Sequence, residues 1–344
     1  MKIIYSAEHI HHNTQTELSG GQLIPPFECA SRMDYICHAL EQSGMGQLAA
    51  PKSFPREHVE KIHAKDYLAF LDSCWDEWQT AGNKGEAMPT VWPSRSMPSN
   101  RIPNDIEGKL GYYALASETA IAQNTAQAAW LSSDIALTAA DAIVQGQSSA
   151  FALARPPGHH ASTDQYGGYC FINNAAVASQ YLLDNGFKKV ALMDVDFHHG
   201  NGTQAIFYDR KDVFFSSIHG DPMDAFPHFL GHADETGAGD GQGYNLNHPL
   251  PPGTPYSVWA EKLDVSLAAF RAYGADVLVV SLGLDTFEND PISFFKVKTN
   301  EYLQMGAALA SLGLPTVFIM EGGYAVEEIG HNTANVLKGF LGIE

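Results

Sequence analysis

The 344-residue chain is short of positive charge, of cysteine and of long apolar runs. It has 20 lysines and arginines against 39 aspartates and glutamates, which gives a formal net charge of −19. Because phosphate binding requires a basic surface, this balance argues against a nucleic-acid partner. An acidic surface suits a cationic ligand, although solubility alone explains it as well.

The other two absences concern the cell compartment. The cysteines at positions 29, 37, 74 and 170 are far apart and form no CxxC pair, so we expect reduced thiols rather than disulfides or a thiolate zinc site. No stretch approaches the ~18 consecutive apolar residues of a membrane span, and the N-terminus turns polar after Tyr5 without the core of a signal peptide. We therefore expect a cytoplasmic protein with no membrane contact.

Apolar segments of two kinds alternate along the chain. Short runs rich in β-branched residues, typical of buried parallel strands, occupy residues 151–155, 190–196, 212–219, 276–283 and 316–323. Segments with helical periodicity lie between them, at residues 174–183, 256–270 and 300–312. This alternation predicts one doubly wound α/β domain, with a parallel sheet and helices on both faces.

Residues 76–111 interrupt the alternation, because they are rich in glycine, proline, serine and asparagine. A loop of this length inside a compact domain is usually functional or disordered. Its aromatic and acidic residues, Trp92, Asp105 and Glu107, disfavour a pure linker. We therefore expect a single domain over residues 1–344, with a long insertion loop at about 76–111.

Polar motifs stand at the ends of four predicted strands, where ligands bind in open parallel sheets. They are RPPGHH (155–160), DVDFHHGNGTQ (194–204), SLGLDTFENDP (281–291) and MEGGY (320–324). Asp194 and Asp196 interrupt an apolar run, and burying such charges is costly unless they are paired or bind a metal. Two carboxylates and one imidazole, from Asp196, Asp285 and His198, suit zinc or ferrous iron. Taken singly each could be a core carboxylate or a helix cap, but together they predict a metal site.

These motifs resemble the histone deacetylase superfamily, and within it the bacterial acetylpolyamine amidohydrolases. Together with GGYCFINNAA (167–176) they occur in family order over nearly the whole chain, and ELSGGQLIPPFE (17–28) and RIPNDIEGKLGYY (101–113) resemble the polyamine branch. The resemblance implies the arginase-deacetylase fold, with an eight-stranded parallel sheet. Arginases share that fold but use a two-manganese DAHxD-like motif that is absent here, so a ureohydrolase is a weak alternative.

The resemblance also implies a reaction, in which a metal ion polarises an acetamide carbonyl that water attacks. His159 and His160 match the family's tandem histidines, and His160 is the expected general base and then acid, with Asp194 orienting His159. Asn201 stands where the commonest family pattern has a second carboxylate, and its lack of charge should leave His160 less biased toward protonation. The division of labour between the histidines stays open. Tyr324 is implied as the donor to the developing oxyanion.

Further residues match family positions for substrate and for monovalent cations. The implied channel and acidic rim consist of Gly168, Tyr169, Phe226, Glu17, Glu107 and Glu118, with Glu118 as the expected partner of a substrate ammonium. One implied potassium site uses the backbone carbonyls of Asp194, Asp196 and His198 with Ser217 and Ile218. A second is implied near Phe207, Arg210, Val213 and Tyr244.

The leading hypothesis is therefore a zinc-dependent enzyme, with Fe²⁺ as the other metal and K⁺ as a further ion, that deacetylates acetylputrescine, acetylcadaverine or acetylspermidine. In the polyamine branch an insertion resembling residues 76–111 forms a homodimer in which one subunit narrows the other's entrance. A protein or acetyl-lysine deacetylase is the nearest alternative. A non-catalytic acyl-ligand or metal-binding protein is the third, against which the intact metal ligands, tandem histidines and Tyr324 count.

Overall fold

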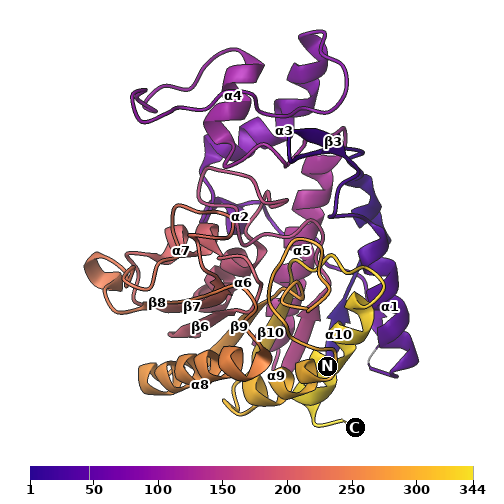
Figure 1. Ribbon diagram of the computed structural model, residues 1–344, viewed down its shortest axis with the longest axis vertical. Coiled ribbons are helices and arrows are strands. Elements are labelled where there is room, and N and C mark those ends of the chain that lie inside the picture. The colour runs from indigo at the N-terminus through magenta and orange to yellow at the C-terminus, as the bar shows by residue number, and fades with distance from the viewer. Residues whose placement is uncertain (46, 344) are drawn as a thin grey trace.

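The computed structural model describes residues 1–45 and 47–343, and its core is one large sheet (Figure 1). The strands of this sheet are β1 (Lys2–Ile4), β4 (Leu48–Ala49), β5 (Ser149–Ala152), β6 (Val190–Asp194), β7 (Val213–Gly220), β8 (Asn245–Leu250), β9 (Val277–Leu282) and β10 (Thr316–Met320). All neighbouring strands are parallel, in the order β4-β1-β5-β10-β9-β6-β7-β8. The eight-stranded parallel sheet implied by the resemblance is confirmed.

Helices cover both faces of the sheet (Figure 1). On one face lie α2 (Glu57–Glu60), α3 (Lys65–Thr80), α4 (Ile106–Tyr113), α5 (Thr125–Val144), α6 (Asn174–Asp184) and α7 (Asn201–Phe207). On the other lie α1 (Ser31–Gln42), α8 (Tyr256–Tyr273), α9 (Glu301–Ala310) and α10 (Ile329–Leu341). Two 3-10 helices (Ala7–His11 and Gly239–Gly241) and an antiparallel hairpin of β2 (Glu17–Ser19) and β3 (Gln22–Ile24) complete the described elements.

Alternating side chains of each central strand enter the two cores. In β9, Val277 and Val279 pack with the α5 and α6 side, whereas Leu278, Val280 and Leu282 pack with the α8 and α9 side. Both faces of the strand are buried, so its sequence is almost continuously apolar. Each such side chain stabilises the fold by about 1.5–3 kcal/mol relative to an exposed one.

The five predicted strands correspond to β5, β6, β7, β9 and β10, and the three predicted helices to α6, α8 and α9. Three strands of the large sheet, and both strands of the β2–β3 hairpin, were not predicted. Strands β1 and β4 have only three and two residues, too few for a periodic pattern. Strand β8 is an edge strand of sequence NLNHPL, and because it is only partly buried its sequence is polar. The sequence therefore predicted the centre of the sheet better than its edges.

The insertion is shorter than the predicted loop over 76–111. Helix α3 continues to Thr80, and α4 begins at Ile106, where the Asp105 carboxylate accepts the N–H of Glu107 at 2.9 Å. The irregular part covers residues 81–105, at the top of the molecule in Figure 1. It is anchored to the body where Trp92 Nε1 donates to the carbonyl of Ala114 at 3.1 Å.

Two expectations about the chain as a whole can be compared with the structure. All four cysteines are free, with Cys74 and Cys170 buried and the other two partly exposed. Within residues 1–45 and 47–343, none of the helices combines the length and apolarity that crossing a bilayer requires.

Candidate active site

Four neighbouring strands at the centre of the sheet, β5, β10, β9 and β6, end at the same edge. The tandem histidines follow β5, the EGGY segment follows β10, Asp285 follows β9, and Asp196 and His198 follow β6. Register brings Asp194 opposite Ser281 and Met320 opposite Leu282. The four motifs, up to 165 residues apart in sequence, therefore meet in one place, as ligand sites in open parallel sheets do.

Asp196, His198 and Asp285 form a buried cluster whose ligand atoms all lie within 4.8 Å of one another. His198 Nδ1 lies 3.3 Å from Asp196 Oδ1 and 2.9 Å from Asp285 Oδ2. Across the described residues neither carboxylate pairs with a lysine or arginine; both lie against the imidazole of His198, and His159 Nε2 is 3.8 Å from Asp196 Oδ1. Carboxylate oxygens and an imidazole nitrogen are donors that Zn²⁺ and Fe²⁺ accept, so the cluster fits a divalent metal ion.

Backbone groups hold the two carboxylates in place. Asp196 Oδ2 accepts the N–H of Gly322 at 2.9 Å, and Asp285 Oδ1 accepts the N–H of Phe197 at 2.7 Å. Gly283 leaves the space that Asp196 needs, because a Cβ there would lie 2.0 Å from Asp196 Oδ2. The donors are thus oriented before any ion binds, which reduces the cost of binding one.

The cluster that fits a metal ion also holds protons, which predicts a pH-dependent metal affinity. Burial alone lowers the pKa of His198, but hydrogen bonds to Asp196 and Asp285 outweigh burial and raise it to about 10. A ligating imidazole must be neutral, so binding releases this proton. Burial and Asp196 also raise the pKa of Asp285, to about 8. We therefore expect the apparent affinity for Zn²⁺ to rise at least about tenfold per pH unit between about pH 6 and 8, measured by competition with a chelator. An affinity independent of pH would contradict this ligand set.

The tandem histidines stand beside the cluster, with their ring centroids 4.0 Å apart. His159 Nδ1 lies 2.9 Å from Asp194 Oδ2, and His160 Nδ1 lies 2.6 Å from Asn201 Oδ1. The Asn201 amide nitrogen donates to the carbonyl of His160, so Oδ1 faces the ring and accepts from Nδ1–H. In neutral His160 the lone pair therefore sits on Nε2, where a general base needs it.

The charge environments of the two rings differ. For His159, burial lowers the pKa, but Asp196 and Asp194 outweigh burial and raise the pKa well above its usual value. For His160, burial together with His159 and His198 lowers the pKa well below its usual value. The carboxylates therefore favour the protonated form of His159, whereas burial and the neighbouring imidazoles favour the neutral form of His160, which suits His160 to the role of the base.

Tyr324 closes the other side of the cluster. Its backbone N–H donates to Asp290 Oδ2 at 2.7 Å, and the Arg32 guanidinium carbon lies 5.1 Å from its ring centroid. Arg32 Nε also donates to the carbonyl of Gly323 at 2.7 Å. Burial raises the pKa of Tyr324 well above its usual value, so its hydroxyl stays protonated and can donate a hydrogen bond.

A cavity of about 290 Å³ leads from the surface to His160, His198 and Tyr324. Aromatic side chains form its walls: the Tyr169 ring lies 5.6 Å from that of Tyr324, and the Phe226 ring 5.1 Å from that of His160. The wall also requires Gly168, since a Cβ there would lie 2.2 Å from the His160 ring. The structure thus brings the three predicted channel residues into one cavity. Its further lining includes Leu18, Ser19, Phe27, Phe197, Ala225, His228, Ile292 and Phe294.

Carboxylates also line the cavity, without any lysine or arginine among the described lining residues. Glu17 is buried and accepts the N–H of Phe27 at 3.0 Å, and burial raises its pKa. Glu118 is half-buried and accepts the N–H of Gly168 at 2.7 Å. Asp224, which the sequence did not single out, is exposed at the rim.

Glu107 is the one predicted acidic residue that the structure does not bring to this cavity. It lies in the first turn of α4 and its side chain is exposed. The helix dipole favours a carboxylate at a helix N-terminus, and this alone explains an acidic residue at position 107. A role at the entrance of a second subunit stays a prediction.

Comparison with known proteins agrees with this geometry. Residues 26–340 match the model of the histone deacetylase domain. The chain belongs to the histone deacetylase family. It is 56% identical to an acetylpolyamine amidohydrolase of Mycoplana ramosa, over 99% of this chain and 100% of the relative, and 48% identical to acetylpolyamine amidohydrolase 2 of Pseudomonas aeruginosa, over 100% and 99%. The crystal structure of an acetylpolyamine aminohydrolase from Burkholderia pseudomallei superposes with a TM-score of 0.94 at 35% identity, covering 99% of this chain and 98% of the other.

Membership of the histone deacetylase family makes the chain a hydrolytic enzyme, as predicted. The positions of the residues expected to hold potassium can be described within the fold. In the first set, Asp194 of β6 is the register partner of Ser217 of β7, and Ile218 follows Ser217, so these three residues are adjacent. In the second set the carbonyls of Phe207 and Tyr244 already accept backbone N–H groups, from Arg210 and Phe215, both at 3.0 Å, and Val213 begins β7. Both potassium sites stay predictions.

Several residues of this histone deacetylase site were not predicted from the sequence. Arg32 and Arg155 both donate to Glu28 Oε1, at 3.0 and 2.7 Å, in a buried ion-pair cluster behind Tyr324. Glu28 and Arg32 are four residues apart, the spacing of a helical ion pair, and this was the signal available. Asp290 and Glu321 lie inside two of the motifs, SLGLDTFENDP and MEGGY, but no role was predicted for either of them.

Proposed function

We propose that this enzyme is a zinc-dependent deacetylase that hydrolyses the acetamide of acetylated polyamines to acetate and a free amine. The observation that supports this most strongly is the cavity, which has aromatic walls, reaches the metal ligand His198 and carries three carboxylates but no lysine or arginine in its described lining. An aromatic wall suits an aliphatic chain, and carboxylates suit its distal ammonium groups. The names of the relatives agree with this substrate class.

Three side chains of the site carry the proposed chemistry. When bound, the metal ion supplies Lewis acidity at the acetamide carbonyl. His160 Nε2 accepts the proton of the attacking water and then delivers it to the leaving amine nitrogen. The Tyr324 hydroxyl donates to the carbonyl oxygen as negative charge develops there. His159 Nδ1–H donates to Asp194, which holds the ring in place beside the reacting groups.

Glu118 is the proposed partner of the substrate ammonium, and replacing it with glutamine tests this. We expect kcat/KM for acetylputrescine to fall about 10- to 100-fold, since one charge-assisted hydrogen bond contributes about 1.5–3 kcal/mol. For N-pentylacetamide, a neutral isostere of acetylputrescine without the ammonium, kcat/KM should change by less than about twofold. Glu57→Gln, at an exposed position of α2 outside the cavity lining, is the matched control. Equal losses on both substrates would show that Glu118 acts on the fold of the wall instead.

The substrate class is tested by kcat/KM of one zinc-loaded sample on acetylputrescine, acetylcadaverine, acetylspermidine and an acetyl-lysine peptide. We expect the acetylated polyamines to be preferred, because the peptide brings no free ammonium to the carboxylates. A clear preference for the peptide would replace the polyamine assignment by a protein deacetylase.

A homodimer is the proposed assembly, through residues 81–105. Apolar side chains are exposed on this segment, with Val91, Met97 and Ile102 between 42% and 55% accessible. A second copy would cover them, and burial of exposed apolar area drives association. Sedimentation equilibrium should give twice the mass of 37.4 kDa. A monomer would remove the proposed role of Glu107.

A further inference from the structure

Two buried carboxylates beside the site take no part in the chemistry above. Glu321 has no exposed surface and Asp290 is 7% exposed. Neither lines the cavity, and neither pairs with a lysine or arginine in the described part of the chain. Both are acceptors of neutral N–H and O–H groups only.

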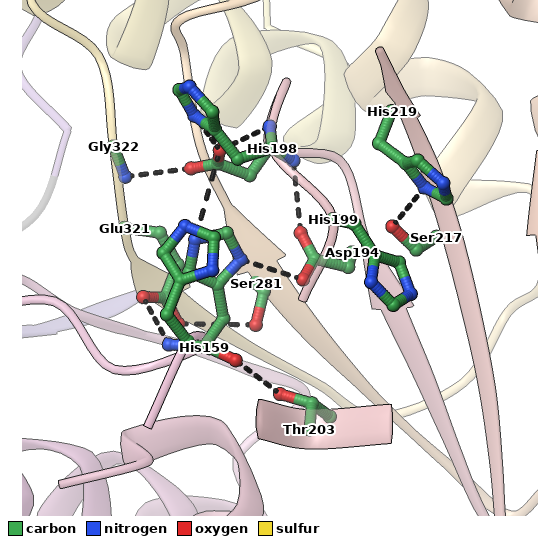
Figure 2. A network of polar contacts seen from close by, with 12 residues as sticks. His159, Asp194, His198, His199, Thr203, Ser217, His219, Ser281, Glu321 and Gly322 are labelled. Carbon is green, nitrogen blue, oxygen red and sulfur yellow. Dashed lines mark hydrogen bonds and ion pairs between the residues drawn. The ribbon is translucent and has the colours of Figure 1, made fainter. Parts of the chain in front are cut away.

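Glu321 holds the turn that carries the tandem histidines. Its Oε2 accepts the backbone N–H groups of Gly158, at 2.7 Å, and His159, at 3.1 Å. Its Oε1 accepts the hydroxyl of Ser281, at 3.2 Å, from the end of β9 (Figure 2). On the far side of the turn the carbonyl of His159 accepts the N–H of Thr203. Hydrogen bonds therefore fix the turn from both sides, and Glu321 accepts those on one side.

Asp290 binds the backbone of the turn that carries Tyr324 in the same way. Its Oδ2 accepts the backbone N–H groups of Tyr324, at 2.7 Å, and Ala325, at 3.3 Å. Its Oδ1 accepts the N–H of Ile292, at 3.1 Å, from the segment after β9. Each catalytic turn is thus bound through two consecutive backbone amides by one carboxylate from another segment.

These carboxylates are expensive to bury. A buried charged group loses its hydration, and three neutral donors recover only part of it. The imidazoles of His159 and His198 partly compensate Glu321 and Asp290, respectively, but burial outweighs them. Burial accordingly raises the pKa of Glu321 to about 7 and that of Asp290 to about 6. A neutral residue in their place would avoid this cost, so stability alone gives no reason for two charges at these positions.

We propose that Glu321 and Asp290 are positioning residues, which hold His160 and Tyr324 at the distances that the reaction requires. The inference rests on the proposed hydrolysis of an acetamide by these two side chains. A displacement of about 1 Å at a reacting group lowers a rate by about 10²-fold, so small movements of either turn are sufficient. An amide in place of the carboxylate keeps the shape but weakens the hold on both N–H groups.

The test uses the zinc-loaded variants Glu321→Gln and Asp290→Asn. We expect kcat to fall about 10- to 100-fold in each, with KM and bound zinc within about twofold of the wild type. Ser281→Ala, a milder change at Glu321 Oε1, should lower kcat by a smaller factor. Asp134→Asn is the matched control, because Asp134 also accepts a backbone N–H, that of Phe54 at 3.1 Å, and has a pKa that burial raises to about 6. It should leave kcat unchanged.

Double variants separate positioning from general damage. If Glu321 acts through His160, Glu321→Gln should cost less than about twofold in a His160→Ala background, and Asp290→Asn likewise in a Tyr324→Phe background. The same factor in both backgrounds, an unchanged kcat in the single variants, loss of zinc or loss of the folded state would each overturn the proposal. Turnover of the same acetamide by the wild type distinguishes the positioning role from the proposed function, because a wild type without turnover would refute the proposed function instead.

Discussion

Replacing Asp285 with asparagine should remove zinc from the protein and abolish turnover. The change takes away one of the two carboxylates that converge on His198 and leaves a neutral oxygen in its place. The ion contributes several kcal/mol to the stabilisation of charge on the acetamide, so its loss should lower kcat/KM by on the order of 10³-fold or more. Elemental analysis after dialysis and acetate release by the same sample are the two measurements.

Asp276→Asn is the matched control for this prediction. Asp276 lies at the opposite end of β9, where its carboxylate accepts the backbone N–H groups of Lys188 and Lys189. The Asp276→Asn variant should keep both zinc and turnover, because Asp276 has no part in the metal cluster. A zinc-loaded, active Asp285→Asn variant would show that the ligand set has been assigned wrongly.

Tyr324→Phe should lower kcat by about 10²- to 10³-fold, the usual loss of one oxyanion donor. The hydroxyl is removed, whereas the ring and the backbone bond to Asp290 remain. Zinc content and KM should therefore stay within about twofold of the wild type, because the lost interaction forms only as charge develops on the carbonyl oxygen. Steady-state kinetics on acetylputrescine and elemental analysis measure the two effects.

Tyr166→Phe serves as the comparison for the tyrosine variant. Tyr166 is buried outside the cavity, and its hydroxyl has no hydrogen-bond partner among the described residues. We expect this variant to turn over at the wild-type rate. If Tyr324→Phe retained comparable activity, its hydroxyl could not be the oxyanion donor.

Much of the fold and of the metal cluster followed from the sequence for a common reason. Central parallel strands are buried on both faces, so their sequences are continuous apolar runs, and charged residues at their ends stand out. Asp196, Asp285 and Tyr324 each follow such a run. Parallel geometry then places the carboxyl ends of neighbouring strands together, although the sequence does not give the order of the strands.

What was missed depends on contacts between segments that have no fixed spacing. Asp224 and Glu107 are both ordinary acidic residues in irregular regions, and only the folded chain shows that Asp224 reaches the cavity rim and Glu107 does not. Glu321 and Asp290 were visible inside quoted motifs, but their bonds to backbone N–H groups of distant turns leave no pattern in the sequence. The helical ends of the predicted 76–111 loop were obscured by its composition.

The most direct test of the account is acetate release from acetylputrescine before and after the metal is removed. We expect the wild type to release acetate, to stop when a chelator has removed its zinc, and to recover when Zn²⁺ is added back, with the chelator-treated protein still folded. Undiminished acetate release by the metal-free protein, or no release from any acetylated polyamine by the zinc-loaded protein, would contradict the account.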